Sequence, residues 1–405
     1  MRIALTTCTF APNLEGGGAI AATALARELA RRGHDVHVIT LPLPDGMREL
    51  DEPGLTVHRI APHGPVAPGA PFPSALKKLE FHLRDSFDPG VMARVGALLD
   101  VIKPDVVNSH AIPGLSGSLW LAAERRGIPV VHYIHELWAI CANAGMFRNN
   151  AGNCRSRCWE CRVITAPRRL LSRRVDTLIA LSAFGLTKMV GAGRFTKSHL
   201  AVLPNAFENV HFTPRPRPPG EGLRLGFLGR IVPNKGLDVL ARALVAADLP
   251  QWRLLVAGSG DPAYVDEVLG MLPPGRVERL GWIDPGELFR RIDLLVVPSV
   301  WQEPMGRILY EAAMHGVPVL ASRVGGMPEI VVEGATGWTV PGGDSAALAE
   351  QLRRLATHPE QLDLPHGAYR SVVDRVRPEN LIPAYERVFE AAADRGRERR
   401  RAAAR

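Results

Sequence analysis

Two glutamates and two basic residues are the side chains whose types and spacing best suit chemistry. Glu303 and Glu311 are separated by seven residues, and Arg230 and Lys235 bracket an earlier short segment. A guanidinium and an ammonium group can together neutralise a diphosphate without a metal ion. Eight helical steps would place the glutamates roughly 12 Å apart, so one could contact a sugar while the other holds a group beyond a diphosphate. Since charged residues mostly lie on surfaces, ordinary exposed glutamates are the alternative.

The elements expected around these side chains place them at the ends of strands. The apolar run 294–297 is typical of a buried parallel strand, and a helix is expected to begin near Gly306. A second strand, expected over 223–228, ends just before the basic pair. Open α/β sheets bind ligands outside the carboxyl ends of their strands. This position favours a binding site over solvated charges.

Both segments also carry a family resemblance. The stretch EPMGRILYEAAMHGVPVLASRVGGMPEIV resembles the E-x7-E signature of family 4 retaining glycosyltransferases, with Met305 where the usual pattern has Phe. The earlier segment resembles the family's G-R-x4-K-G arrangement. The resemblance implies that Glu303 contacts the transferred sugar, that Glu311 holds the ribose hydroxyls, and that Arg230 and Lys235 bind the diphosphate.

The resemblance extends to the N-terminal part of the chain. A strand over 2–6, a glycine loop and a helix from Ala19 are similar to half of a Rossmann fold, although G-x-G-x-x-G is absent. The family has a functional histidine after a later strand, which implies that His135 contacts a hydroxyl of the donor sugar or of the acceptor. A structural, hydrogen-bonded histidine is the alternative. Further donor contacts are implied for Gly17, Gly18, Gly258, Ile283, Met305, Gly306 and Arg307.

The length of 405 residues predicts two domains. We expect an α/β chain of GT-B architecture, with two Rossmann-like, doubly wound domains that face a cleft. The first domain is predicted over 1–204 with a C-terminal crossover helix at about 372–393. A linker over 205–222 and a donor-binding domain over 223–371 follow, and 394–405 is expected to be a basic, frayed tail.

The positive charge is concentrated in the first half. The net charge is +8, and residues 1–204 contain 24 Lys or Arg against 16 Asp or Glu. A basic face indicates an anionic partner, such as membrane phospholipid or a lipid diphosphate, although a solvated face is equally open. Nucleic acid is not expected, because no helix-turn-helix, zinc-finger or RNP pattern accompanies the charge. The segment 74–87 reads as an amphipathic helix that lies on a membrane, over an acceptor site, or simply packed on the surface.

No apolar stretch is long enough for a membrane span, and no signal-peptide layout is found at the N-terminus. We therefore expect a cytoplasmic protein, with peripheral attachment to the inner face of the membrane as a further expectation.

Four of the five cysteines are clustered. Cys141 precedes Cys154, Cys158 and Cys161, whose C-x3-C-x2-C spacing suits a structural zinc site of four thiolates. Free thiols are an alternative, and disulfides are less expected in a reducing compartment. No cofactor is expected for catalysis itself.

The combined prediction is a retaining hexosyltransferase that uses a UDP- or GDP-linked sugar. The acceptor hydroxyl is expected to belong to a lipid-linked or other glycan in cell-envelope polysaccharide synthesis, with His135, Glu303, Arg230 and Lys235 as catalytic residues. Alternatives are a nucleotide-sugar 2-epimerase, glycosylation of a small metabolite, and a non-catalytic sugar or nucleotide binder.

Overall fold

The computed structural model describes residues 1–14, 16–64, 72, 74–148, 152–214 and 222–403, so most of the predicted linker and part of the proline-rich stretch lie outside the described residues. The chain divides into two compact units. The first contains 1–145, 156–208 and 377–405, and the second contains 146–155 and 209–376. The grouping of 146–155 with the second unit differs from the domain boundaries expected from sequence.

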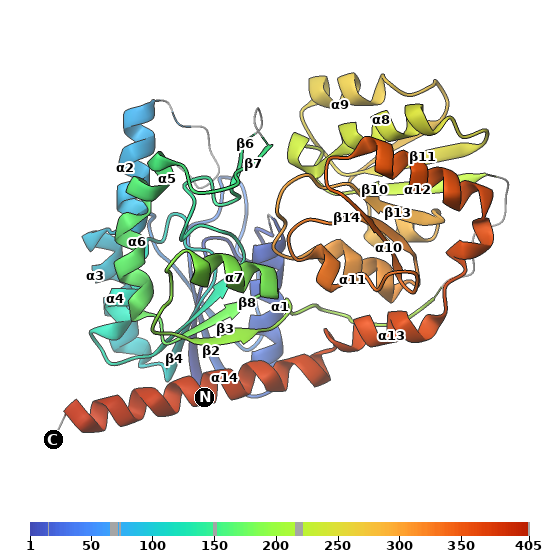
Figure 1. Cartoon of the computed structure of the whole chain (residues 1–405). Coiled ribbons are helices and arrows are strands. Elements are labelled where there is room, and N and C mark those ends of the chain that lie inside the picture. The colour runs from blue at the N-terminus through green and yellow to red at the C-terminus, as the bar shows by residue number, and fades with distance from the viewer. Residues whose placement is uncertain (15, 65–71, 73, 149–151, 215–221, 404–405) are drawn as a thin grey trace. The chain divides into compact units, whose positions relative to one another are not determined.

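The first unit is built on a seven-stranded sheet in which all neighbours are parallel (Figure 1). The order β3-β2-β1-β4-β5-β8-β9 reverses direction at β1 and β4, as in a doubly wound fold. Strands β4, β5 and β8 are buried along their whole length, as expected of a parallel sheet covered on both faces, and this includes the polar Asn108, Ser109 and His132. The strands are β1 Arg2–Thr6, β2 Asp35–Thr40, β3 Leu55–Arg59, β4 Val106–Ser109, β5 Val130–Ile134, β8 Thr177–Ala180 and β9 His199–Val202.

Helices cover this sheet. They are α1 Gly16–Arg31, α2 Ala75–Ser86, α3 Pro89–Ile102, α4 Ser118–Glu124, α5 Trp159–Ile164, α6 Ala166–Leu171, α7 Ala183–Gly191 and α14 Pro378–Ala403. Asp88 and Ser182 cap the first turns of α3 and α7 with their side chains. One expectation is corrected, because Gly16, Gly17 and Gly18 form the first turn of α1 rather than a loop before it.

The C-terminal helix α14 lies along the first unit (Figure 1). Tyr385 from this helix donates a hydrogen bond of 2.7 Å to the hydroxyl of Tyr133 in β5. Residues 394–403 continue the same helix, and Arg395 and Arg399 pair with the buried Asp176. The expected frayed tail is therefore wrong over 394–403, because these ion pairs and the packing of the helix extend order beyond the expected crossover.

The second unit has a six-stranded parallel sheet of order β12-β11-β10-β13-β14-β15. This is the doubly wound order, and the direction of winding changes between β10 and β13. The strands are β10 Leu223–Leu228, β11 Trp252–Ala257, β12 Val277–Gly281, β13 Leu294–Val297, β14 Val319–Ser322 and β15 Gly337–Val340. The helices are α8 Leu237–Ala247, α9 Pro262–Leu269, α10 Pro285–Phe289, α11 Arg307–Met314, α12 Ser345–Thr357 and α13 His366–Asp374.

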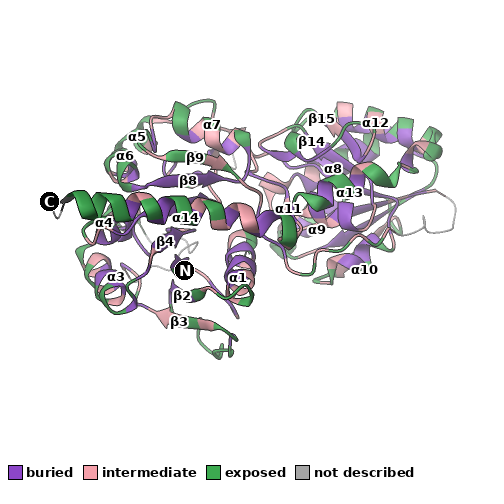
Figure 2. Cartoon of the chain, turned by 90° about the horizontal axis from the view of Figure 1, so that it is seen from below, coloured by how far each residue is buried: buried purple, intermediate pink, exposed green. Residues whose placement is uncertain are grey.

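Burial follows this layering in both units. Figure 2 shows that central strands such as β4 and β8 are buried, whereas the edge strands β3 and β9 are partly exposed and the helices present mixed faces. In the second unit Leu240 and Leu244 of α8 belong to the same buried cluster as Leu348 and Leu352 of α12. A short antiparallel hairpin, β6 Phe147–Arg148 and β7 Gly152–Asn153, completes the described strands. Within the described ranges, no helix has the length and apolar character needed to cross a membrane.

Candidate active site

The change of winding between β10 and β13 brings two loops together in the second unit. Lys235 lies in the loop after β10, and Glu303 lies in the loop after β13. Gly236 makes the close approach feasible, because it has φ of +73° and a Cβ atom there would lie 2.0 Å from the carbonyl oxygen of Pro298. The amide of Val300 donates to the carbonyl of Asn234 across the same junction, at 3.0 Å. The sheet topology therefore places both side chains at one edge.

Lys235 and Glu303 form an ion pair at this edge. The Nζ atom of Lys235 lies 2.8 Å from Oε1 of Glu303, while Ser299 donates to Oε2 at 3.1 Å. The Lys235 ammonium also lies 5.5 Å from the ring centroid of Trp301. The side chains of Lys235 and Glu303 are 23% and 15% exposed, so both are held in place yet open to a ligand. This arrangement can present one cation to a phosphate and one carboxylate to a sugar hydroxyl.

A tight turn holds the backbone of Glu303. Gly325 has φ of +59°, and a Cβ atom on it would lie 1.9 Å from the carbonyl oxygen of Glu303. The amide of Gly326 donates to that carbonyl at 2.8 Å. The Gly325-Gly326 turn thus packs directly against the loop that carries Glu303.

The second glutamate lies on the following helix. Gly306 is the N-cap of α11, and Glu311 accepts a hydrogen bond of 2.9 Å from Nε of Arg307 one turn earlier. Met305 is buried at 5% exposure, as the apolar residue of the usual pattern would be. The described residues show two separate ion pairs, Lys235 with Glu303 and Arg307 with Glu311, rather than one four-residue cluster.

Arg230 occupies the same loop as Lys235 but is exposed. No ion pair of Arg230 with a described residue is present. Its loop is anchored by Ile231, whose amide donates to Ser259 at 2.7 Å, and Gly258 donates to Gly281 at 2.6 Å. The structure therefore leaves the Arg230 guanidinium available for a ligand instead of joining it to the glutamates.

Ile283 is half-buried just after β12, following the exposed Trp282. Gly258 has φ of +124°, and a Cβ atom there would lie 1.9 Å from the carbonyl oxygen of Gly229. The backbones at the ends of β10, β11 and β12 therefore lie in close contact, and glycine at position 258 makes that approach possible.

In the first unit, a chain of hydrogen bonds ends at His135. Nε2 of His135 lies 2.7 Å from Nδ1 of His110, and Nε2 of His110 lies 2.7 Å from Oδ1 of Asn108. Asn108 uses its amide nitrogen to donate to the carbonyl of Val131, so its oxygen accepts from His110. A neutral His110 must then accept from His135, which leaves the Nδ1 lone pair of His135 as a hydrogen-bond acceptor.

Both imidazoles stay neutral in this setting. Burial, with a smaller effect of the nearby His132, lowers the pKa of His135 to about 3. Burial and His135 lower the pKa of His110 well below its usual value. The pKa of His135 is therefore too low for a general base that works near neutral pH. Its neutral imidazole is suited instead to accept a hydrogen bond from a hydroxyl.

The start of α1 lies against the same ring. A Cβ atom on Gly18 would lie 3.4 Å from Cγ of His135, whereas one on Gly17 would meet nothing within 4 Å. The first-turn amides of α1 thus begin next to the histidine, with open space at Gly17. The N-terminus of a helix is suited to hold anionic or hydroxyl groups.

Asn153 is a site residue that no motif in the sequence indicated. Its amide nitrogen donates to the carbonyl of Val300, and its oxygen accepts from the amide of Gln302 at 3.2 Å. These two hydrogen bonds hold the backbone of Val300 and Gln302, which flank Trp301 and immediately precede Glu303. The only signal in the sequence was the position of Asn153 next to Cys154 in an otherwise polar loop.

The clustered cysteines are free thiols in the structure. None of the five is in a disulfide, and Cys161 hydrogen-bonds with Cys141 and Cys158. Hydrogen bonding with Cys141, followed by burial, raises the pKa of Cys161 well above its usual value. Across the described ranges no group of three or more His, Cys, Asp or Glu side chains could hold a metal ion. A structural zinc stays a prediction for elemental analysis.

Each unit matches a known protein family model. Residues 16–206 match a family model described as glycosyl transferase 4-like domain, and residues 222–358 match one described as glycosyl transferases group 1. A D-inositol 3-phosphate glycosyltransferase of Actinosynnema mirum is 31% identical over 375 residues, covering 85% of this chain and 84% of the relative. An uncharacterized 42.6 kDa protein in the cps region of Klebsiella pneumoniae is 24% identical, covering 82% and 87%.

Solved structures share the fold. Anabaena HepE in complex with UDP-glucose superposes with a TM-score of 0.71 at 20% identity, covering 96% of this chain and 100% of that one. This likeness extends over both α/β units.

Proposed function

The chain belongs to the group 1 glycosyltransferases, with two Rossmann-like units of the GT-B type, and from that premise we propose that it transfers a sugar from a UDP-linked donor to an acceptor hydroxyl with retained anomeric configuration. The Lys235–Glu303 pair at the switch point between β10 and β13 carries this proposal. The ammonium of Lys235 and the carboxylate of Glu303 lie 2.8 Å apart. At that separation Lys235 can contact the diphosphate of the donor while Glu303 contacts the sugar attached to it.

The donor is proposed from the charges of the loops. Lys235 and the exposed Arg230 supply positive charge for a leaving diphosphate, and no metal ion is needed for that role. Glu311 and the backbone near Ile283 would hold the ribose and the base. Anabaena HepE, a structural neighbour, was solved with UDP and with UDP-glucose, which supports UDP as the first nucleotide to test.

A front-face route is the proposed mechanism. Departure of the diphosphate is stabilised by Lys235 and Arg230, and a phosphate oxygen takes the proton of the incoming acceptor hydroxyl on the same face of the sugar. Glu303 would accept a hydrogen bond from a sugar hydroxyl and so orient it. The hydrogen bonds from Lys235 and Ser299 hold the carboxylate in a fixed position, and each of its oxygens can accept a further bond. His135 would accept a hydrogen bond from a sugar or acceptor hydroxyl through Nδ1.

The proposed acceptor is a lipid-linked or cell-envelope glycan. The first unit exposes an apolar stripe on α2, where Leu76, Leu79 and Leu83 are 73%, 41% and 50% exposed. Lys77 and Lys78 lie beside the stripe. An amphipathic helix with basic flanks is suited to contact an anionic lipid surface, where a lipid-linked acceptor would be found. The position of the Klebsiella relative in a cps region is consistent with such an acceptor.

A second acceptor class, a phosphorylated polyol, is favoured by one observation. The Actinosynnema relative is a D-inositol 3-phosphate glycosyltransferase and aligns with 85% of this chain. A small metabolite of that kind would not need a membrane contact.

The deciding experiment combines donor screening with product analysis. Purified protein is incubated with UDP-hexoses and GDP-hexoses, either with a lipid extract or with inositol phosphates, and UDP or GDP release is measured. We expect release with a UDP-sugar that depends on one acceptor class, and NMR of the product should show the donor's anomeric configuration. An inverted product would disprove retention. Conversion of the donor to its 2-epimer without an acceptor would instead identify an epimerase.

A further inference from the structure

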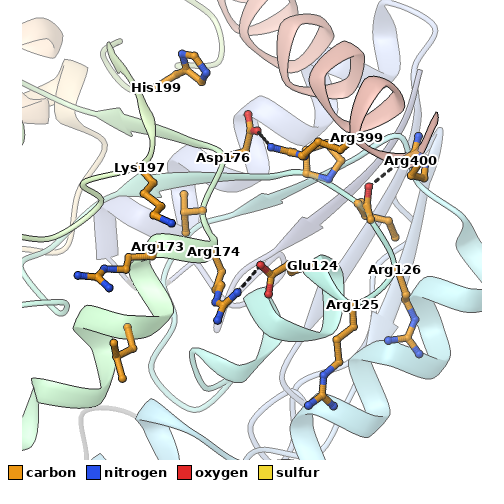
Figure 3. Close-up of a pocket in the computed structure, with 15 residues that line it drawn as sticks. Glu124, Arg125, Arg126, Arg173, Arg174, Asp176, Lys197, His199, Arg399 and Arg400 are labelled. Carbon is orange, nitrogen blue, oxygen red and sulfur yellow. Dashed lines mark hydrogen bonds and ion pairs between the residues drawn. The ribbon is translucent and has the colours of Figure 1, made fainter. Parts of the chain in front are cut away.

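The amino edge of the seven-stranded sheet carries a basic cavity that the proposed reaction does not use. Its volume is about 1010 Å³, and Pro129, Asp176 and His199 line it at the start of β5, β8 and β9. Figure 3 shows the basic side chains that line it, which come from the turn after α4, from the segment after α6, from Lys197 before β9 and from the end of α14. His135 follows the opposite end of β5, and a five-residue strand spans roughly 16 Å. The cavity is therefore a separate feature of the first unit.

The acidic residues of this cavity are already neutralised. Seven Lys or Arg side chains line it, against Glu124 and Asp176 alone. Arg174 lies 2.7 Å from Glu124, and Asp176 pairs with both Arg399 at 2.8 Å and Arg395 at 2.7 Å (Figure 3). The lining therefore keeps a large excess of positive charge.

Besides Arg400, whose printed partner is the carbonyl of Gly127, three of these cations have no acidic partner in the part of the chain that the structure describes. Arg125, Arg173 and Lys197 are exposed and form no salt bridge there. The carbonyl groups of Ala122 and Gly127 near the end of α4 are not partners of these three cations, because they accept from Arg126 and Arg400. Unpaired cations that face a common hollow repel one another, and a bound anion would relieve that repulsion.

The chemistry of the lining points to phosphate. Guanidinium groups bind phosphate oxygens through paired, charge-assisted hydrogen bonds. The volume exceeds that of a single phosphate and suits a larger phosphorylated molecule. Leu170, which is 62% exposed, lines the same cavity and offers an apolar contact beside the charges.

We propose that this cavity binds a phosphate-bearing anion, either a soluble polyphosphate or the phosphorylated headgroup of a lipid. Arg173 and Lys197 supply donors, as does Arg125, one of whose amino groups also contacts the sulfur of Met92 at 3.6 Å. The arginines paired with Glu124 and Asp176 add further positive charge around the cavity. The inference goes beyond the proposed glycosyl transfer and does not depend on it, because it uses none of the residues assigned to that reaction.

The test compares two double variants that make the same change in charge. Arg173→Glu with Lys197→Glu reverses two cations of the cavity, whereas Arg253→Glu with Arg354→Glu reverses two exposed cations of the second unit. Binding of inorganic tripolyphosphate is measured by titration calorimetry at low ionic strength. Sedimentation with phosphatidylglycerol vesicles and with phosphatidylcholine vesicles gives the lipid arm.

We expect the cavity variant to lose at least about tenfold in affinity for one of the two anionic probes, while the control variant changes less than about twofold. Loss of tripolyphosphate binding identifies a soluble ligand, and loss of vesicle binding alone identifies a headgroup. Equal losses in both variants would reduce the effect to diffuse charge and overturn the proposal, as would a cavity variant that binds both probes normally.

Two further variants keep the result interpretable. Lys235→Ala should retain the binding that the cavity variant loses, and loss of tripolyphosphate binding in Lys235→Ala alone would assign the anion to the donor loop and contradict the proposal. Arg125→Ala with Lys197→Ala provides a neutral substitution if circular dichroism shows that the charge reversal disturbs folding.

Discussion

Nζ of Lys235 lies 2.8 Å from Oε1 of Glu303, and this contact joins the loops that follow the two central strands of the six-stranded sheet. The two residues are 68 positions apart in the chain. Their meeting depends on the parallel pairing of β10 with β13, which places both carboxyl ends at the same edge.

Lys235→Ala should lower donor-sugar turnover about 100-fold, because the leaving diphosphate loses a preorganised cation. The thermal midpoint should change little, since a partly exposed ion pair contributes about 0–1 kcal/mol to stability. UDP release and thermal unfolding measure the two effects. Arg242→Ala, which breaks the exposed pair with Asp238 on α8, is the control and should leave turnover unchanged. Turnover near normal in Lys235→Ala would refute the assigned role.

Asn153→Ala should raise the donor KM and lower kcat, together by about tenfold in kcat/KM, because the backbone around Trp301 loses both of its side-chain hydrogen bonds. Asn153→Asp keeps the acceptor for Gln302 but cannot donate to Val300, so an intermediate value is expected. Hydrogen exchange at 300–303 should accelerate in parallel with the loss of activity. Unaltered exchange in Asn153→Ala would show that the contact does not order this loop.

The catalytic pH profile should contain no inflection from His135 between pH 5 and pH 8. Burial keeps its pKa at about 3, so the imidazole is neutral throughout this range. His110→Phe removes the group that accepts from Nε2 of His135, and we expect kcat to fall about tenfold as the tautomer is no longer imposed. An inflection near pH 6.5 that disappears in His135→Ala would contradict this role.

Glu136 should make the protein less stable as the pH rises. Burial and the charge of Asp85 raise the pKa of Glu136 from 4.5 to about 7, so the folded state holds a proton that the unfolded state releases above pH 4.5. The resulting loss between pH 4.5 and pH 7 is on the order of 2 kcal/mol for a partly hydrated carboxyl group. Glu136→Gln cannot ionise, and its thermal midpoint relative to wild type should be higher at pH 8 than at pH 4.5. An identical difference at both pH values would exclude Glu136 as the source.

Gly325→Ala should disrupt the acidic loop. The substitution combines φ of +59° with a Cβ atom 1.9 Å from the carbonyl oxygen of Glu303, so the backbone must move. We expect a loss of about 2 kcal/mol or more in stability and a matching loss of activity. Gly334→Ala provides a comparison with a similar φ of +68° but no atom within 4 Å of the added Cβ, and it should cost less than Gly325→Ala.

Several elements could be predicted closely from the sequence. The predicted bounds of β1, β10 and β13 equal the observed ones, and β13 was recognised because a buried parallel strand is often continuously apolar. The Gly16–Gly18 segment was misread because glycine is a poor helix former, yet the packing of α1 carries its helix through these residues. The C-terminal residues 394–403 were expected to fray because their composition is highly charged, and the ion pairs to Asp176 were not visible in the sequence.

The amino-acid sequence by itself determined the two α/β units, the strand ends that carry the basic and acidic residues, and the family resemblance that the comparisons confirm. Those features depend on local apolar patterns and on motifs of adjacent residues. Only the tertiary structure decided that Glu303 pairs with Lys235 while Arg230 stays exposed, that Asn153 holds the loop of Trp301, and that scattered arginines line one cavity. These are contacts between residues distant in the chain, and the strand order and helix packing that create them are not encoded in any single stretch of sequence.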